Sequence, residues 1–371
     1  MKFVVNRDLF ARALARVQGV VSRKASLSVL SNVLLEASED GRLRVAATDL
    51  DVTFDGALNS RVTEAGRITV DGKRLFEVVR SLPGEEVDVA VGEADRLTLR
   101  CKNTEFVLLG ASADSFPQLP TARGVELTPV DGSVLRELFE RTMFSVSTDE
   151  SRPNLNGVYF RCLADDRVRM VSTDGHRLSQ GERACGRGAP LPERDGVIIP
   201  RKGVAEIKRL LDEVGAEVAF GFLENNLVLE AGDLTLFVRL IDANFPDYRQ
   251  VIPKSSERHV VLDRVPLLNS LKRIEILASE RTHGVRIELK GSAMTLSSNN
   301  PDLGSAKEEV AVEGYDGGDL VIAFNAKYMR EILGILSADK VELALNEALS
   351  PGLIREYEND GYLFVVMPMR I

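Results

Sequence analysis

Residues 171–178, which read Val-Ser-Thr-Asp-Gly-His-Arg-Leu, hold the side chains whose types and spacing could do chemistry. Asp174 and His176 could form a general acid–base pair, in which a carboxylate orients an imidazole. However, no serine or cysteine nucleophile motif accompanies them, and the other histidines, His259 and His283, are too scattered to form a metal cluster. A histidine that hydrogen-bonds or lines a pocket is therefore the favoured interpretation, and we expect no catalytic residues.

Other possible ligand sites in the sequence are weak. The cysteines, Cys101, Cys162 and Cys185, are odd in number and form no Cys-x-x-Cys pair, which indicates a reducing cytoplasm and no zinc site. Residues 299–302 resemble a calcium loop but lack the glycine and the distal glutamate of an EF-hand, and no Gly-rich phosphate loop is present. We therefore expect no cofactor and no metal.

The chain carries no pattern that would direct it to a membrane. Residues 1–8 lack the apolar stretch of a secretory signal, and no apolar run approaches membrane-spanning length. We expect a cytoplasmic protein without a membrane partner.

The motif belongs to an internal repeat. It follows a predicted β-hairpin of residues 157–161 and 168–171, and similar segments occur at residues 43–50 and 294–300. Thr48, Thr173 and Ser298 are each separated by 125 residues, a period that is too long for a solenoid and fits a whole domain. The sequence therefore predicts three domains, at residues 1–125, 126–253 and 254–371.

Each third contains two stretches with the apolar spacing of an amphipathic helix, separated by alternating strand patterns. The predicted helices run from Arg7 to Val21, Lys73 to Leu82, Ser133 to Phe144, Lys202 to Val214, Val265 to Ala278 and Ala326 to Ser337. The predicted fold is α+β, with two helices packed on antiparallel sheets in each of three repeated units.

The net charge of −9 argues at first against a nucleic-acid partner, because nucleic-acid-binding domains are usually basic. The six helical segments, however, hold 20 Lys/Arg against 12 Asp/Glu, which leaves 27 against 44 in the rest of the chain. A single charged helix face is most often simply solvated, but segregation across all six helices predicts a face that meets an anion.

The whole chain resembles the bacterial sliding clamps, the beta subunits of DNA polymerase III. The resemblance rests on the Met-Lys-Phe start, Leu-Asn-Gly at 155–157, residues 173–178, Pro-Arg-Lys-Gly at 200–203, Phe-Pro-Asp-Tyr-Arg at 245–249 and Val-Val-Met-Pro-Met-Arg at 365–370. It implies a non-enzymatic processivity factor: a head-to-tail homodimer whose six domains form a ring, with helices inside and sheets outside. Such a ring would encircle and slide on double-stranded DNA without reading its sequence.

The resemblance also implies partners. The alpha subunit of DNA polymerase III, the delta subunit of the clamp loader, other DNA polymerases and mismatch-repair proteins would insert a short motif, a glutamine followed by leucine and a terminal Leu-Phe pair. Gln250 stands where an arginine often lines the receiving groove. The peptide-binding residues implied are Leu155, Thr173, Gly175, His176, Arg177, Leu178, Pro246, Gln250, Val251, Asn325, Tyr328, Val365, Val366, Met367, Pro368, Met369 and Arg370.

The resemblance also implies a set of residues that would face DNA and a set that would form the dimer contact. The expected DNA-facing cations are Lys24, Arg80, Arg201 and Lys202. The expected dimer contacts are Arg96, Phe106, Leu108, Ile276 and Leu277, beside strand edges at Thr104–Leu109 and Ala293–Ser297 that would pair between protomers.

An alternative stays open, in which an enzyme or adaptor of unknown substrate shares the fold alone. The presence of both residues 173–178 and the terminal Val-Met-Pro-Met-Arg favours the clamp, because a mere fold relative would need neither.

Overall fold

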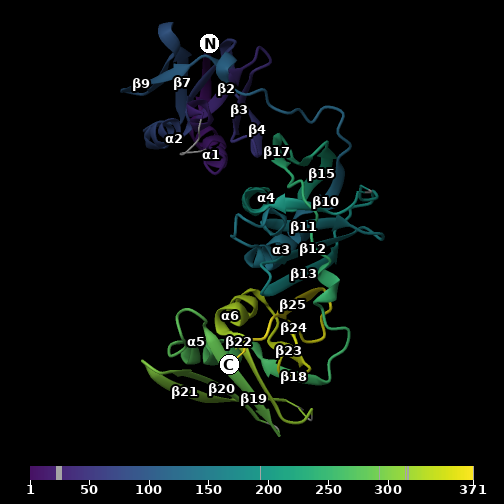
Figure 1. Cartoon of the computed structure of the whole chain (residues 1–371). Coiled ribbons are helices and arrows are strands. Elements are labelled where there is room, and N and C mark those ends of the chain that lie inside the picture. Colours follow the sequence, from purple (N-terminus) through teal and green to yellow (C-terminus); the bar gives the residue numbers. More distant parts are fainter. Residues whose placement is uncertain (22–26, 193, 292, 314, 316, 371) are drawn as a thin grey trace. The chain divides into compact units, whose positions relative to one another are not determined.

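The computed structural model describes residues 1–21, 27–192, 194–291, 293–313, 315 and 317–370. The chain forms two compact units (Figure 1), the first made of Met1–Ser133, Gly186–Pro192 and Lys202–Leu240 and the second of Val134–Cys185, Glu193–Arg201 and Ile241–Ile371. The predicted middle domain thus contributes segments to both units. The three predicted domain boundaries stay a prediction.

All six predicted helices are present in the described part of the chain. They are α1 (Arg7–Val17), α2 (Gly72–Ser81), α3 (Gly132–Thr142), α4 (Arg201–Val214), α5 (Arg264–Glu275) and α6 (Ala326–Ile335). The first ends four residues earlier than predicted, because Gln18 caps it and donates its N–H to the carbonyl of Ala15. Each helix is amphipathic, as α1 illustrates by burying Phe10 and Leu14.

One continuous antiparallel sheet of thirteen strands forms the first unit, in the order β10-β15-β16-β17-β4-β3-β2-β6-β9-β8-β7-β1-β5. Strands β17 and β4 pair with Leu236 opposite Phe54, which joins the predicted first and middle domains through backbone hydrogen bonds. The strands are β1 (Lys2–Asn6), β2 (Asn32–Ala37), β3 (Arg42–Thr48), β4 (Val52–Asn59), β5 (Arg61–Glu64), β6 (Gly66–Asp71), β7 (Glu86–Val91), β8 (Arg96–Cys101), β9 (Thr104–Ala111), β10 (Thr128–Asp131), β15 (Glu217–Leu223), β16 (Asn226–Ala231) and β17 (Leu234–Arg239).

Two sheets form the second unit, an eight-stranded one in the order β14-β11-β12-β13-β25-β24-β23-β18 and a four-stranded one in the order β21-β20-β19-β22. The predicted hairpin is confirmed as β11 and β12, and Asp165 and Asp166 both have the positive φ of a tight turn between them. The strands are β11 (Gly157–Cys162), β12 (Arg167–Thr173), β13 (Arg177–Ala184), β14 (Val197–Pro200), β18 (Arg258–Asp263), β19 (Gly284–Lys290), β20 (Ala293–Asn300), β21 (Gly304–Ala311), β22 (Leu320–Asn325), β23 (Lys340–Leu345), β24 (Gly352–Glu356) and β25 (Tyr362–Val366).

Among the described strands, two open edges bear on the predicted dimer contacts. In the first unit, β9 pairs with β8 from Thr104 to Leu109, whereas its other side meets β6 only at Gly110 and Ala111. In the second unit β21 is one of the terminal strands and pairs with β20 alone among the described strands. The prediction that Ala293–Ser297 would be such an edge is wrong, because β20 lies between β19 and β21 and its backbone groups bond on both sides.

Two classes of feature are absent from the described residues. None of their helices combines the length and apolar character needed to cross a membrane. No group of three or more His, Cys, Asp or Glu side chains within those residues is placed to hold a metal ion.

Candidate functional site

The turn between β12 and β13 is held by its own side chains. Gly175 has a φ of +90°, a conformation that favours glycine. Thr173 accepts the Gly175 N–H at 3.1 Å and donates its hydroxyl to the carbonyl of Arg177 at 2.6 Å. Asp174 Oδ1 accepts the N–H groups of His176 and Arg177 at 2.9 and 3.0 Å. Asp174 therefore shapes the backbone of the turn, and the acid–base pair considered from the sequence is not formed with the His176 ring.

Arg177 is the buried centre of this site, with 8% of its surface exposed. Its Nε donates to Asp174 at 3.0 Å and its Nη2 donates to the carbonyl of Phe144 at 2.8 Å. Its Nη1 forms a short ion pair with Glu331 of α6, and its guanidinium lies 4.4 Å from the centre of the Tyr328 ring. Because its donors are taken within the protein, Arg177 fixes α6 against the turn.

Tyr328 and Asn325 form the start of α6 beside this turn. The Tyr328 ring stacks against the exposed His176 ring, with centroids 6.5 Å apart. Burial, and then the nearby charge of Asp174, raise the pKa of Tyr328, so its phenol stays neutral at neutral pH. Asn325 caps the helix by accepting the Tyr328 N–H at 3.2 Å, and its amide donates to the carbonyl of Thr282 at 3.1 Å.

The end of the chain is hydrogen-bonded to this same turn. Strand β25 pairs with β13, with Leu178 opposite Val365. Beyond the strand, the Met367 N–H donates to the carbonyl of His176 at 2.9 Å, and the Met369 N–H donates to the carbonyl of Ala323 at 2.8 Å. The structure therefore brings together the two motifs that are almost 190 residues apart in the sequence. We call residues 367–370 the terminal arm.

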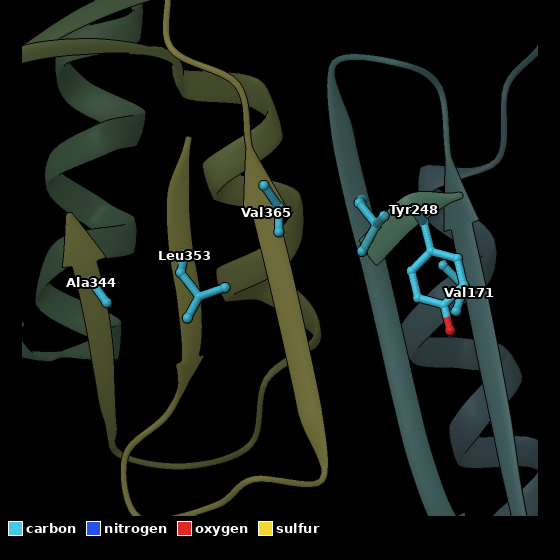
Figure 2. Packing of buried hydrophobic residues seen from close by; sticks show 6 residues of the cluster. Val171, Tyr248, Ala344, Leu353 and Val365 are labelled. Atoms are coloured by element: carbon cyan, nitrogen blue, oxygen red, sulfur yellow. The ribbon is translucent and has the colours of Figure 1, made fainter. Parts of the chain in front are cut away.

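An apolar cluster lies under the arm. Its buried members are Val171, Leu178, Tyr248, Ala344, Leu353 and Val365, with Phe245 and Val251 packed against it. Figure 2 shows Ala344, Leu353 and Val365 on neighbouring strands, and Val171 and Tyr248 on the other side of the cluster. Leu178 and Val365 are only 2% and 1% exposed, whereas Pro246, Val251 and Met367 are more accessible.

The other predicted groove residues lie around this cluster with differing access. Leu155 is 8% exposed and Val366 is 1% exposed, while Pro368 is half-buried in the arm. Gln250 is exposed and donates to Asp247 at 3.2 Å. Sequence reasoning passed over Tyr248, although it lies two residues after Pro246 in the Phe-Pro-Asp-Tyr-Arg motif that supported the resemblance.

A polar cavity of about 590 Å³ adjoins the turn. It is lined by the predicted groove residues His176, Arg177 and Tyr328 together with Arg201, which was predicted to face DNA. Its further charged lining residues are Asp174, which was considered from the sequence only as part of an acid–base pair, and Asp149, Arg152, Lys327 and Glu331, which sequence reasoning missed. The four missed residues come from the loop between α3 and β11 and from α6, so no local pattern in the sequence marks them as neighbours of the turn.

Leu349 is a second feature that sequence reasoning missed. It is 62% exposed in the loop between β23 and β24, and that loop ends at Gly352, which pairs with Val366. A large exposed apolar side chain of this kind is a candidate contact for a partner.

The predicted DNA-facing cations differ in their freedom to meet a phosphate. Arg80 is exposed in the last turn of α2, and neither it nor Arg201 has an ion pair with any residue that the structure describes. Lys202 instead forms a short ion pair with Asp49. Lys24 lies outside the described residues.

The predicted dimer residues lie on β8 and β9 in the first unit and just beyond α5 in the second. In the first unit Arg96 is exposed, Phe106 is 36% exposed and Leu108 is half-buried, while Leu109, which was not predicted, is 75% exposed. In the second unit Ile276 is 72% exposed just beyond α5, and Leu277 is half-buried.

Comparison with known protein families and their members gives matches along the whole chain. The chain matches three models of the DNA polymerase III beta subunit, for the N-terminal domain at residues 1–120, the central domain at 129–247 and the C-terminal domain at 249–370. The beta sliding clamp of Pseudomonas aeruginosa is 36% identical over 375 residues, with both chains covered in full.

Solved structures agree with the sequence comparison. The crystal structure of the Pseudomonas aeruginosa clamp bound to griselimycin is 35% identical, covers both chains in full and has a TM-score of 0.93. The Bacillus subtilis clamp is 26% identical, with a TM-score of 0.95 over 100% of this chain and 99% of that one. The predicted resemblance and the predicted fold of three clamp domains, each with helices and antiparallel sheets, are confirmed. The chain belongs to the family of DNA polymerase III beta subunits, the bacterial sliding clamps, which are processivity factors and not enzymes.

Proposed function

We propose that this chain forms a homodimeric ring that slides on duplex DNA and holds other replication and repair proteins on it through a groove at the terminal arm. The observation that carries the proposal is the pairing of β13 with β25, because it places residues 173–178 and the arm in one site. Neither motif alone forms a binding surface, and together they offer apolar walls with a few directed polar groups.

The ring is supported by the open strand edges and their exposed apolar neighbours. The free side of β9 and the free side of β21 belong to different units of one chain. Pairing the β9 edge of one protomer with the β21 edge of its partner is a heterologous contact, and two such contacts close a dimer. Phe106 and Leu109 on one edge and Ile276 on the other would supply the apolar contact.

Free cations on the helices support sequence-independent retention on DNA. Arg80 and Arg201 make no ion pair within the described residues and can face phosphates, whereas Lys202 would first have to leave Asp49. Contacts of this kind carry no base information and weaken with salt. The ring geometry, not tight binding, would then keep the protein on DNA.

The groove would receive a short linear motif with leucine and phenylalanine anchors. Pro246, Val251 and Met367 offer apolar contacts above the buried cluster, and His176, Asn325 and Tyr328 offer polar groups beside it. The clamp of Pseudomonas aeruginosa binds griselimycin, so a relative has a ligand site. The occupants we propose are the alpha subunit of DNA polymerase III, the delta subunit of the clamp loader, and other polymerases and mismatch-repair proteins that carry the motif.

The test is titration of a fluorescent peptide containing Gln-Leu-x-Leu-Phe against the full chain and against a truncation that lacks residues 367–371. Burial of two apolar anchors leads us to expect roughly micromolar affinity for the full chain. The truncation should bind at least about tenfold more weakly, because it loses the arm and the side of the groove that Met367 forms.

A point variant separates loss of the groove from general damage. Met367→Asp should weaken binding as the truncation does, because it puts a charge where an apolar anchor docks. Val265→Asp is the matched control, since Val265 is 47% exposed on the first turn of α5, where an acidic residue is tolerated. Equal affinity of the full chain, the truncation and Met367→Asp would refute the groove.

A further inference from the structure

The four-stranded sheet of the second unit carries a second cavity, also of about 590 Å³. Three strands place polar side chains in a line across the outward face of the sheet. Arg286 of β19 lies opposite Ser297 of β20, and Ser297 lies opposite Lys307 of β21. The alternate residues point the other way, as Ile287 and Leu296 show by being fully buried. Arg370 of the terminal arm also lines this cavity.

Three cations line the cavity, and one of them, Arg286, also has a carboxylate beside it. Arg286, Lys307 and Arg370 line it, and none of the lining residues that the structure describes is acidic. The nearest acid to Arg286 is Glu288 on the same strand, at 3.6 Å, and Lys307 and Arg370 have no ion pair with any residue in the described part of the chain. Three cations facing one hollow repel each other, and an anion between them would relieve that repulsion.

The acid that follows Lys307 directly, Glu308, points to the other side of the sheet, whereas Glu288 and Glu309 share the outward face with Arg286 and Lys307 but do not line the cavity. Glu308 follows Lys307 on β21 and accepts hydrogen bonds from Ser270 at 2.6 Å and from Arg273 at 3.0 and 2.5 Å, both on α5. These bonds, with that from Arg273 the strongest, hold the pKa of Glu308 at about 2. Glu308 is therefore held by α5 and does not contribute its charge to the cavity.

The cavity is continuous with the proposed groove through the terminal arm. Met369 and Arg370 belong both to the predicted groove and to this cavity, and Thr282, another lining residue, accepts a hydrogen bond from Asn325 at the groove rim. If the apolar anchors at the end of a motif lie on the cluster and its glutamine lies at the rim, the residues before the glutamine reach Arg370. A carboxylate there would lie at the cavity that Arg286 and Lys307 also line.

We propose that this cavity binds acidic side chains of a partner segment immediately N-terminal to the clamp-binding motif, so that aspartate or glutamate at those positions strengthens binding. The inference rests on the proposed function of the groove. Arg286 and Lys307 supply the charge, Arg370 closes the cavity on the arm side, and Ser297 and Thr282 offer hydroxyl donors.

The experiment compares two fluorescent peptides that carry the same motif, one preceded by Glu-Glu and the other by Gln-Gln. The full chain should bind the acidic peptide about fivefold more tightly at low salt, and the difference should shrink as salt is raised. Arg286→Gln should reduce the difference below about twofold while binding of the Gln-Gln peptide stays unchanged. Lys290→Gln is the matched control, because Lys290 is exposed on the same face of β19 but does not line the cavity.

Charge reversal gives an independent measurement. Arg286→Glu should prefer a Lys-Lys peptide over the Glu-Glu peptide, which a general effect on folding cannot produce. Equal binding of the acidic and neutral peptides by the full chain would overturn the inference but leave the groove intact, whereas failure to bind the neutral peptide would overturn the groove itself. Inorganic phosphate that protects the chain from unfolding through Arg286, with no gain from acidic peptide residues, would identify a small-anion site and refute a partner segment.

Discussion

Replacing Glu356 by glutamine should destabilise the second unit by about 3 kcal/mol. Glu356 ends β24 and is 3% exposed. Its Oε1 accepts the N–H groups of Ser337 and Ala338, just beyond α6, at 2.8 and 3.2 Å. The Nη1 of Arg141, on α3, lies 3.1 Å from the same oxygen, and Arg141 is itself 7% exposed. The carboxylate therefore ties the end of α6 and helix α3 to the sheet.

The magnitude follows from what glutamine keeps and what it removes. Its amide oxygen can still accept from Ser337 and Ala338, but a hydrogen bond to a neutral acceptor contributes about 1 kcal/mol less than one to a charged acceptor. Removing one partner of a buried ion pair costs about 3–5 kcal/mol, because the other charge is left uncompensated. Glu137 remains 3.0 Å from the Nη2 of Arg141 and is 33% exposed, so the lower end of that range is expected.

Thermal unfolding followed by circular dichroism measures this loss. For a unit of this size about 3 kcal/mol corresponds to a decrease of roughly 6–12 °C in the melting temperature. Glu358→Gln is the matched control, since Glu358 lies exposed in the turn just beyond β24 and should change the melting temperature little. Adding Arg141→Met to Glu356→Gln should recover part of the loss by removing the orphaned charge. A decrease below about 2 °C for Glu356→Gln would refute the reasoning.

The loss of stability caused by Glu356→Gln should depend on pH. Burial by itself would raise the pKa of Glu356, but the hydrogen bonds from Ser337 and Ala338 and the charge of Arg141 outweigh it, and the pKa is lowered. A carboxyl whose pKa is lowered by folding stabilises the protein above its unfolded pKa, and this contribution disappears as the pH falls through the folded value. The difference between the native chain and Glu356→Gln should therefore be full at pH 7 and shrink below about pH 4.

Two further predictions concern the turn and the ring. Gly175→Ala should destabilise the protein by about 1–2 kcal/mol, because φ is +90° there, and should weaken peptide binding several-fold in a fluorescence titration. Gly318→Ala is the control: its φ is +79° and the space around it is open, so the substitution should strain its own turn and leave the peptide affinity unchanged. In light scattering the native chain should be a dimer at micromolar concentration, and Leu109→Asp should be a monomer. Only the dimer should stay on closed circular DNA at moderate salt, and it should leave when that DNA is linearised. Equal retention on linear DNA would indicate simple binding instead of encirclement.

The sequence alone determined the repeat, the six helices and the family. Apolar spacing is a local property, so it predicted α2 and α4 to within about a residue at their ends. Ends closed by tertiary contacts or tightened turns were less predictable: α5 stops at Glu275, three residues early, because Ile276 and Leu277 donate to carbonyls three residues back. Motifs such as residues 173–178 identified the family because several of them occur together over the whole chain.

Only the tertiary structure decided which residues are neighbours. The alternating pattern of Ala293–Ser297 marks a strand but not its place in the sheet, and backbone pairing makes it interior and β21 the edge. Likewise, Lys202 looked like a free cation until folding placed Asp49 beside it. The line of Arg286 and Lys307 across three strands depends on register, which the whole sheet sets and no single segment encodes.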